Sequence, residues 1–192
     1  MESRSSVEWA LRDLIAKLSV IKPGVIDVNS KGPPVLLFTD GACEGDLVTV
    51  GGVIFPSMAS SPKHFGLKVP QDVWRAWRTK ADQRQVIGQA EILPVVVARM
   101  TFPNLLRGRR VIVFIDNEAA RIGLVRCYSP SLPSLRLIAQ AVSLDVVLGC
   151  QCWYARVPTK ANVADLPSRL VFSPFLESLG SQGVEPVVPE WW

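Results

Sequence analysis

The chain has 192 residues, of which 48% are hydrophobic, and it carries a formal net charge of +4. This length suits one domain with a short appendage. Because no run of about eighteen apolar residues occurs, we expect no membrane-spanning helix and no membrane partner. The four cysteines have neither the spacing of a zinc framework nor the density of a secreted disulfide scaffold, so free thiols and an intracellular location are expected.

Basic residues are concentrated in the middle of the chain. The stretch from residue 63 to residue 126 holds twelve Lys and Arg against five Asp and Glu, a net charge of +7. Such an excess suits a polyanionic partner. A solvated surface with ordinary basic residues is the alternative that charge alone leaves open.

The first elements lie before the main domain. Residues 7–19 repeat apolar side chains at helical spacing, which predicts an amphipathic helix. Residues 22–34 contain three prolines and two glycines, which indicates a linker. We therefore expect a helix and linker over residues 1–34, a domain over 35–172 and a tail over 173–192.

The first half of the domain predicts a meander followed by a helix. Residues 35–39, 47–55 and 63–70 are expected to form three consecutive antiparallel strands. Residues 71–85 are polar and are helical or irregular. Residues 85–100 have a helical apolar face, although Pro94 lacks a backbone donor and is expected to kink or break this helix.

The second half of the domain alternates strands and helices. Residues 111–115 are a short apolar run that predicts a strand, and Asn117 or Asp116 can cap the helix that follows. Further along we expect a helix at 133–147, a strand at 150–157 and a short helix from residue 162. The order β-β-β-α-β-α-α-β-α predicts an α/β fold, with a mixed sheet flanked by helices.

Four carboxylates lie at the ends of these predicted strands and helices or beside their apolar faces. Asp40 and Asp116 each follow an apolar strand, Glu91 lies in a helix beside its apolar face, and Asp165 begins the last helix. If the two strands are parallel neighbours, both aspartates emerge at one edge of the sheet. A cluster of carboxylates suits Mg²⁺, and two such ions can hold a phosphodiester between them. A single aspartate after a strand is otherwise a common turn residue.

Four sequence blocks carry a family resemblance. "FTDGA", "GQAEIL", "VFIDNEAA" and "VPTKANVADLPSR" resemble, in order, the blocks of the ribonuclease H family as found in retroelement reverse transcriptases. The resemblance covers roughly residues 35–170. It implies a mixed five-stranded sheet, three antiparallel strands and then two parallel ones, with flanking helices. It also implies hydrolysis of the RNA strand of RNA–DNA hybrids with two Mg²⁺ or Mn²⁺ ions, and a polymerase domain as a partner.

The resemblance also implies roles for individual residues. Asp40, Glu91, Asp116 and Asp165 match the family's metal ligands. Many relatives carry a histidine between the last strand and the last aspartate, whereas the only histidine here is His64. Lys160 lies in the matching loop, so the auxiliary role of that histidine is either absent or taken by this lysine.

Other polar residues are candidates for binding nucleic acid. Three of them have a structural alternative: Asn117 can cap a helix, Arg169 can pair with a carboxylate, and Trp74 can pack with Trp77 as a helical stripe. The candidates are Asn117, Lys160, Arg169, Arg75, Arg78 and Trp74.

Two other functions compete with the ribonuclease hypothesis. The first is a catalytically weak or inactive module of the same fold that binds nucleic acid or a protein. The second is an integrase, transposase or exonuclease relative that acts on DNA, which the strand order and the ending "ADLPSR" disfavour. Fold alone does not choose among them.

Overall fold

The computed structural model describes residues 11–12, 15–16, 32–78, 86–172 and 177–192. Two units can be distinguished, Met1–Gly32 and Pro33–Trp192. Within the expected helix at 7–19, the described pairs 11–12 and 15–16 are helical, and the rest of that helix and most of the linker lie outside the described residues. The division at residues 34 and 172 stays a prediction. No helix in the described part of the chain is long and apolar enough to cross a membrane.

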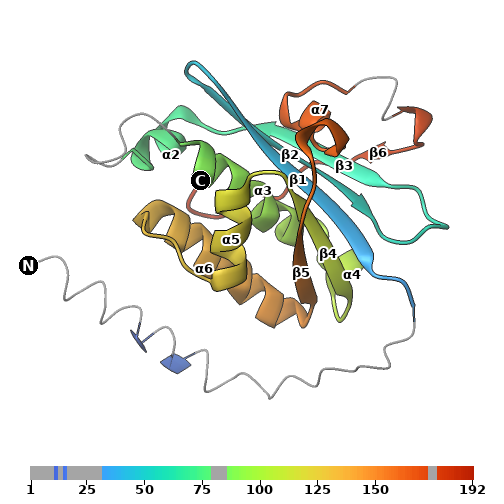
Figure 1. Ribbon diagram of the computed structural model, residues 1–192, viewed down its shortest axis with the longest axis horizontal. Coiled ribbons are helices and arrows are strands. Elements are labelled where there is room, and N and C mark those ends of the chain that lie inside the picture. The colour runs from blue at the N-terminus through green and yellow to red at the C-terminus, as the bar shows by residue number, and fades with distance from the viewer. Residues whose placement is uncertain (1–10, 13–14, 17–31, 79–85, 173–176) are drawn as a thin grey trace, which may run out of the picture. The chain divides into compact units, whose positions relative to one another are not determined.

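The unit from Pro33 onwards alternates strands and helices much as the sequence predicts (Figure 1). In chain order its elements are β1 (Val35–Glu44), β2 (Leu47–Phe55), β3 (Lys63–Lys68), α2 (Gln71–Ala76), α3 (Ile87–Thr101), α4 (Pro103–Leu106), β4 (Arg110–Ile115), α5 (Glu118–Arg126), α6 (Leu132–Leu148), β5 (Gln151–Arg156), the 3₁₀ turn η1 (Thr159–Ala161), α7 (Asp165–Ser168) and β6 (Gln182–Gly183).

The strands form one mixed sheet in the order β5-β4-β1-β2-β3-β6. β1, β2 and β3 pair antiparallel, whereas β4 and β5 are added in parallel on the other side of β1. The α/β class and the expected arrangement of three antiparallel and two parallel strands are therefore confirmed. A two-residue strand that the sequence did not indicate, β6, pairs in parallel with the outer edge of β3.

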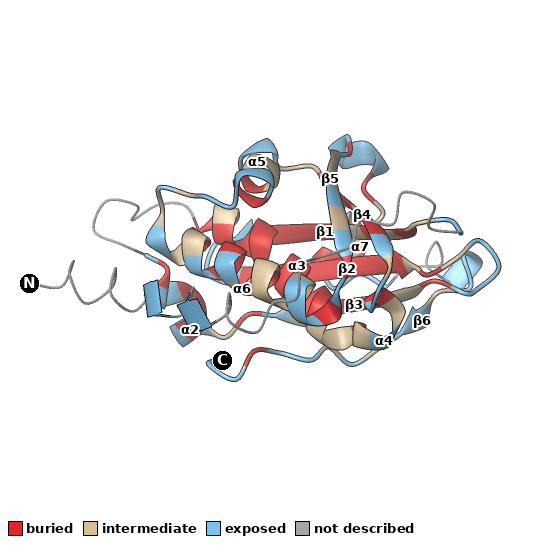
Figure 2. Cartoon of the chain, turned by 90° about the horizontal axis from the view of Figure 1, so that it is seen from below, coloured by how far each residue is buried: buried red, intermediate tan, exposed pale blue. Residues whose placement is uncertain are grey.

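The helices divide between the two faces of the sheet. α3, α5 and α6 lie on one side, whereas α7 lies on the other (Figure 1). Alternate β1 residues such as Val35 and Leu37 are buried in the core against α3. In Figure 2 the buried residues gather along β1, β2 and the central helices. The sheet therefore presents a large helix-covered face and a second face on which α7 is docked.

The first strand is longer than the sequence indicated. We expected it to end before Asp40, but β1 continues through this residue to Glu44. The extension is explained by the hairpin, because β1 and β2 pair as far as Glu44 and Leu47 across a turn at Gly45, whose φ is +59°. A left-handed φ of this kind favours glycine. Asp40 is thus held inside a paired strand.

We expected Pro94 to kink or break its helix. The helix α3 runs through Pro94 without a break, so a break is wrong, whereas a kink stays a prediction. The missing N–H of Pro94 leaves the Ala90 carbonyl without its usual helical donor. However, every residue from Gln89 to Arg99 is buried, so α3 is held by tertiary contacts on all sides. Packing of this extent offsets the loss of one helical hydrogen bond.

A buried ion pair further fixes α3. Arg99 is 1% exposed, and its Nε donates to Asp145 Oδ1 of α6 at 2.5 Å. Its terminal nitrogen also donates to the Tyr154 hydroxyl at 2.9 Å. α3, α6 and β5 are therefore tied together around one satisfied guanidinium, and Glu91, two turns earlier on α3, is held on a rigid support.

Candidate metal centre

Three of the four predicted carboxylates meet at one point. β1 and β4 are parallel neighbours with Phe38 opposite Phe114, which places Asp40 and Asp116 two residues further along adjacent chains. Glu91 reaches the same point from α3. Each of the three contributes one carboxylate oxygen to a group whose atoms all lie within 4.8 Å of one another. The expected parallel pairing therefore brings distant carboxylates together.

Gly41 allows this approach between strand and helix. It follows Asp40 directly, and a Cβ at this position would collide with the backbone of Ala90 and Glu91. The absence of a side chain lets the first turns of α3 lie directly on β1. The glycine of the "FTDGA" block thus has a structural reason to stand beside the acidic residue.

Two of the three carboxylates, Asp40 and Glu91, lie in an environment that is unfavourable for negative charge. Asp40 and Glu91 are each only 5% exposed. Burial raises the pKa of Asp40 to about 6, with smaller contributions from the charges of Asp116 and Asp165 against a lowering hydrogen bond from Ser168. Burial also raises the pKa of Glu91 to about 9, and the nearby Asp40 and Asp116 add to the effect. A cation between them would remove this repulsion.

Unpaired oxygen atoms support a cation at this point. Glu91 Oε2 and Asp116 Oδ1 are buried, and neither has a hydrogen-bond partner among the residues that the structure describes. Buried polar atoms normally have partners, so two orphans in one cluster need an explanation. Carboxylate oxygens are the ligands that Mg²⁺ and Mn²⁺ prefer. The residues present therefore fit a hard divalent ion.

Asp165 lies near this group but outside it. The Ser168 hydroxyl lies within hydrogen-bond distance of both the Asp40 carboxylate and the Asp165 main-chain carbonyl, which places the two residues close together. However, Asp165 Oδ1 accepts a hydrogen bond from Arg169 Nε at 3.1 Å, and Arg169 also binds Glu44 Oε1 at 2.7 Å. The fourth predicted ligand is therefore engaged in a surface ion pair.

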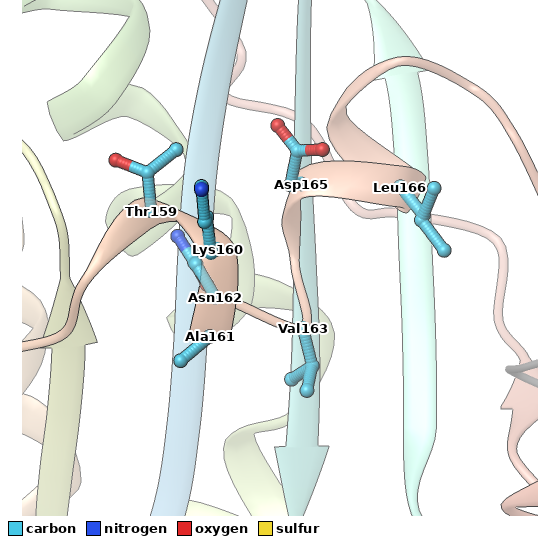
Figure 3. A pocket seen from close by; sticks show the side chains of 7 residues that line it. All are labelled: Thr159, Lys160, Ala161, Asn162, Val163, Asp165 and Leu166. Atoms are coloured by element: carbon cyan, nitrogen blue, oxygen red, sulfur yellow. The ribbon is translucent and has the colours of Figure 1, made fainter.

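The loop before Asp165 forms an open hollow beside the site. Its volume is about 360 Å³, and in Figure 3 the side chains of Lys160 and Asp165 project in the same direction. Asn162 anchors the loop, because its buried side-chain amide donates to the Thr39 carbonyl at 3.1 Å. Asn162 therefore fixes η1 and the start of α7 next to Asp40. The lining residues are Thr159, Lys160, Ala161, Asn162, Val163, Asp165 and Leu166.

The residues predicted to contact nucleic acid differ in their exposure and in the contacts that they make within the protein. Asn117 is the N-cap of α5, and its Oδ1 accepts from the Ala120 N–H at 3.1 Å. Arg75 and Arg78 are exposed on and just after α2. Trp74 is 1% exposed, so the expectation that its ring stacks on a base is wrong. The ring packs into the core, as the alternative held, and the Arg78 guanidinium lies 4.5 Å from its centroid.

Two residues of the site were not recognised in the sequence. Asn162 holds the loop, and Ser168 donates a hydrogen bond from its hydroxyl to Asp40 Oδ2 at 2.5 Å. Both lie inside the quoted block "VPTKANVADLPSR", so the block indicated their neighbourhood but not their contacts. Their partners are in β1, more than a hundred residues earlier in the chain.

A second cluster of potential ligands does not suit a cation. Asp145, Cys150 and Cys152 also bring one ligand atom each within 4.8 Å of one another. The guanidinium of Arg99 already lies among them, bound to Asp145 and 3.3 Å from Cys152 Sγ. A buried positive charge that is already paired with the carboxylate leaves no need for a metal ion there.

Comparison with solved structures places this fold among ribonucleases H. Ribonuclease H1 from the halophilic archaeon Halobacterium salinarum NRC-1 is 19% identical, with a TM-score of 0.55, over 70% of this chain and 94% of that chain. LC11 ribonuclease H1, solved in complex with an RNA/DNA hybrid, is 16% identical, with a TM-score of 0.49, over 74% of this chain and 99% of that chain. The N-terminal ribonuclease H domain of a Mycobacterium tuberculosis protein, solved as a maltose-binding-protein fusion, is 15% identical, with a TM-score of 0.47, over 76% of this chain and 95% of that chain.

No family model and no curated protein matches the sequence. The likeness to the Halobacterium structure, together with the strand order, nevertheless establishes the architecture. The chain has a ribonuclease H fold.

Proposed function

We propose that the protein is a metal-dependent endoribonuclease that cleaves the RNA strand of RNA–DNA hybrids. One observation carries the proposal: Asp40, Glu91 and Asp116 converge within 4.8 Å on a ribonuclease H fold, and two of their buried oxygens have no hydrogen-bond partner in the described part of the chain. A carboxylate cluster of this kind is suited to phosphodiester hydrolysis assisted by two divalent ions.

The residues of the chain have distinct parts in this proposal. Asp40, Glu91 and Asp116 would hold one ion, and Asp165 would complete the ligand set for a second from the start of α7. When bound, Mg²⁺ or Mn²⁺ ions supply an activated water and charge stabilisation for the leaving 3′ oxygen. Because Glu91 and Asp40 are buried, bulk water would screen the attraction between their carboxylates and the metal ions only weakly. Lys160 would lie beside the cleaved phosphate.

The surface around α2 is the proposed binding surface for the RNA–DNA hybrid. Arg75 and Arg78 are both exposed, and Trp74 holds their guanidinium groups in place from the core side at 5.8 and 4.5 Å from its ring centroid. Fixed arginines are well suited to phosphate contacts. The tryptophan thus acts as a support for the two arginines and not as a stacking surface.

The origin that we propose is a retroelement reverse transcriptase, intracellular and joined or once joined to a polymerase domain. The four sequence blocks support this origin, most directly "NVADLPSR". The basic stretch of residues 63–126 supports a nucleic-acid substrate.

A cleavage assay tests the proposal. Labelled RNA in an RNA–DNA duplex is incubated with and without Mg²⁺, next to double-stranded RNA and double-stranded DNA. We expect Mg²⁺-dependent cleavage of the hybrid RNA alone, leaving 5′ phosphate and 3′ hydroxyl ends. Asp116→Asn is expected to abolish cleavage, and cleavage at the parent rate by this variant would contradict the role of Asp116.

The ion pair at Asp165 favours one alternative, a catalytically weak or inactive binding module. Arg169 and Glu44 engage the fourth carboxylate, and Lys160 stands where many relatives have a histidine. In that case the protein binds the hybrid in the same assay with no cleavage in either Mg²⁺ or Mn²⁺. Hybrid binding is therefore measured in parallel by fluorescence anisotropy.

A further inference from the structure

We propose that Ser168 is a positioning residue that fixes the carboxylate of Asp40 in the orientation needed to bind a divalent ion. This inference rests on the proposed function, because it concerns the same carboxylate cluster. It adds a residue outside the four predicted ligands, and it gives the last sequence block a second task besides supplying Asp165.

The contact itself is short and completely buried. Ser168 is 0% exposed, and its Oγ lies 2.5 Å from Asp40 Oδ2. The same hydroxyl is 2.8 Å from the Asp165 main-chain carbonyl. A hydroxyl has a single proton to donate, and a carboxylate is a stronger acceptor than a neutral carbonyl. The proton is therefore directed at Asp40.

The sheet is shaped to accept Ser168 at this place. Asp40, Gly51 and Gly66 are paired in register across β1, β2 and β3 and form one row. A Cβ at Gly51 would collide with the backbone of Pro167 and Ser168, and a Cβ at Gly66 would collide with the Pro167 carbonyl. Two glycines in the row of Asp40 thus form a flat platform on which α7 lies directly.

This platform determines where the serine hydroxyl points. Because the α7 backbone touches β2 and β3, its end cannot move away from Asp40 without losing both contacts. Asp40 Oδ2 is thereby occupied by a protein donor, whereas Glu91 Oε2 and Asp116 Oδ1 have none within the described chain. Oδ1 is then the Asp40 oxygen that Ser168 does not bind. Hydrogen bonds of this type orient metal-ligating carboxylates.

Mn²⁺ titration of matched variants tests the proposal. Isothermal titration calorimetry on the full chain compares the parent with Ser168→Ala and Ser168→Cys, which remove or weaken the donor. Loss of an orienting hydrogen bond typically weakens metal binding about tenfold or more, and we expect a Kd for Mn²⁺ at least about tenfold higher in both variants. Ser168→Thr retains the hydroxyl and is expected to bind Mn²⁺ within about threefold of the parent Kd.

Ser143→Ala is the matched control. The Ser143 hydroxyl donates to the Ala139 carbonyl within α6 at 2.8 Å, and α6 contributes none of the clustered carboxylates, so its loss should leave the Kd unchanged. Thermal melts in EDTA report folding for every variant. A purely structural serine would lower the melting temperature and leave the Kd for Mn²⁺ as in the parent. Parent-like Mn²⁺ affinity in folded Ser168→Ala, or in folded Ser168→Cys if the alanine variant does not fold, overturns the proposal.

The titration separates this inference from the proposed function because it needs no hybrid. If the parent binds Mn²⁺ and the Ser168 variants weaken binding while no RNA is cut, the positioning role is supported and the ribonuclease proposal fails. If the parent binds no Mn²⁺ at all, both are overturned, since Ser168 would then orient no ligand.

Discussion

Arg169 reaches back one helical turn to Asp165, with its Nε 3.1 Å from Oδ1 of the carboxylate. A terminal nitrogen of the same guanidinium binds Glu44 at the end of β1. The fourth predicted ligand is thus paired with a cation, whereas Asp40, Glu91 and Asp116 each bring one carboxylate oxygen within 4.8 Å of the others. Arg169 therefore competes with any metal ion for Asp165.

We expect Arg169→Gln to make the site easier to load with metal. Both partners of this pair are partly exposed, at 46% and 33% for the side chains of Arg169 and Asp165, so the pair is worth at most about 1 kcal/mol. The Mg²⁺ concentration for half-maximal cleavage should fall by roughly two- to fivefold, measured under single-turnover conditions. Arg126→Ala, an exposed arginine at the end of α5, is the control. A higher Mg²⁺ requirement in Arg169→Gln would indicate that this arginine serves the substrate instead.

The carboxylate cluster predicts that the metal-free protein loses stability as the pH rises. The pKa of Asp40 is raised from 3.8 to about 6 and that of Glu91 from 4.5 to about 9, so the folded state binds more protons than the unfolded state between those limits. The free energy of unfolding therefore decreases from about pH 4 to about pH 9. Below this window both states are protonated, and the penalty disappears.

Urea unfolding in EDTA at pH 5, 7 and 9 measures this effect. The double variant Asp40→Asn/Glu91→Gln should flatten the pH dependence and be more stable than the parent at pH 9. Saturating Mn²⁺ should raise the stability of the parent most at high pH and have little effect on the double variant. Equal slopes in parent and double variant would show that the two carboxyls are not the source of the pH dependence.

The sequence predicted that Asp40 and Asp116 meet on the condition that their strands are parallel neighbours, an arrangement that the family resemblance implied and that the strand pairing confirms. The position of Asp40 inside β1 was missed, since the length of the hairpin is set by pairing with β2 and not by β1 alone. Pro94 was expected to kink or break α3, and the helix continues through it because burial along most of its length overrides the local preference.

The contacts of α7 could not have been predicted from local sequence. Ser168 meets Asp40 across 128 positions, and the meeting depends on Gly51 and Gly66 lying in one row of the sheet. From the sequence, Arg169 could bind either a phosphate or a carboxylate. Only the fold shows that Glu44 and Asp165 lie within hydrogen-bond distance of it. Side-chain contacts of this kind depend on how α7 packs against the sheet, which cannot be predicted from a single sequence.

The two exposed arginines that follow Trp74 predict that the affinity for the hybrid depends on salt concentration. If Arg75 and Arg78 contact phosphates, each releases counterions, and log affinity falls roughly linearly with log salt concentration. We expect Arg75→Ala/Arg78→Ala to weaken hybrid binding and to reduce the steepness of this line by about one to two units, measured by fluorescence anisotropy from 50 to 300 mM salt. Arg107→Ala is the control for loss of a basic residue. A slope equal to that of the parent would mean that these arginines only cover the Trp74 ring.

The final prediction concerns Lys160, which is exposed in η1 and projects in the same direction as Asp165 (Figure 3). The Asn162 anchor holds this loop against β1, so Lys160 is kept near the place where a cleaved phosphate would lie. An ammonium group can hold phosphate by charge but stays protonated at neutral pH, whereas a histidine in its place would titrate there.

Lys160→Ala is therefore expected to lower turnover about tenfold, or about 1.4 kcal/mol in activation free energy. Lys160→His should keep activity equal or higher and acquire a pH dependence near neutrality. Steady-state and single-turnover rates between pH 6 and 9 measure both effects, with hybrid affinity recorded in parallel to separate binding from turnover. If Lys160→Ala equals the parent at every pH, the loop has no part in the chemistry and the histidine of the relatives has no counterpart at this position.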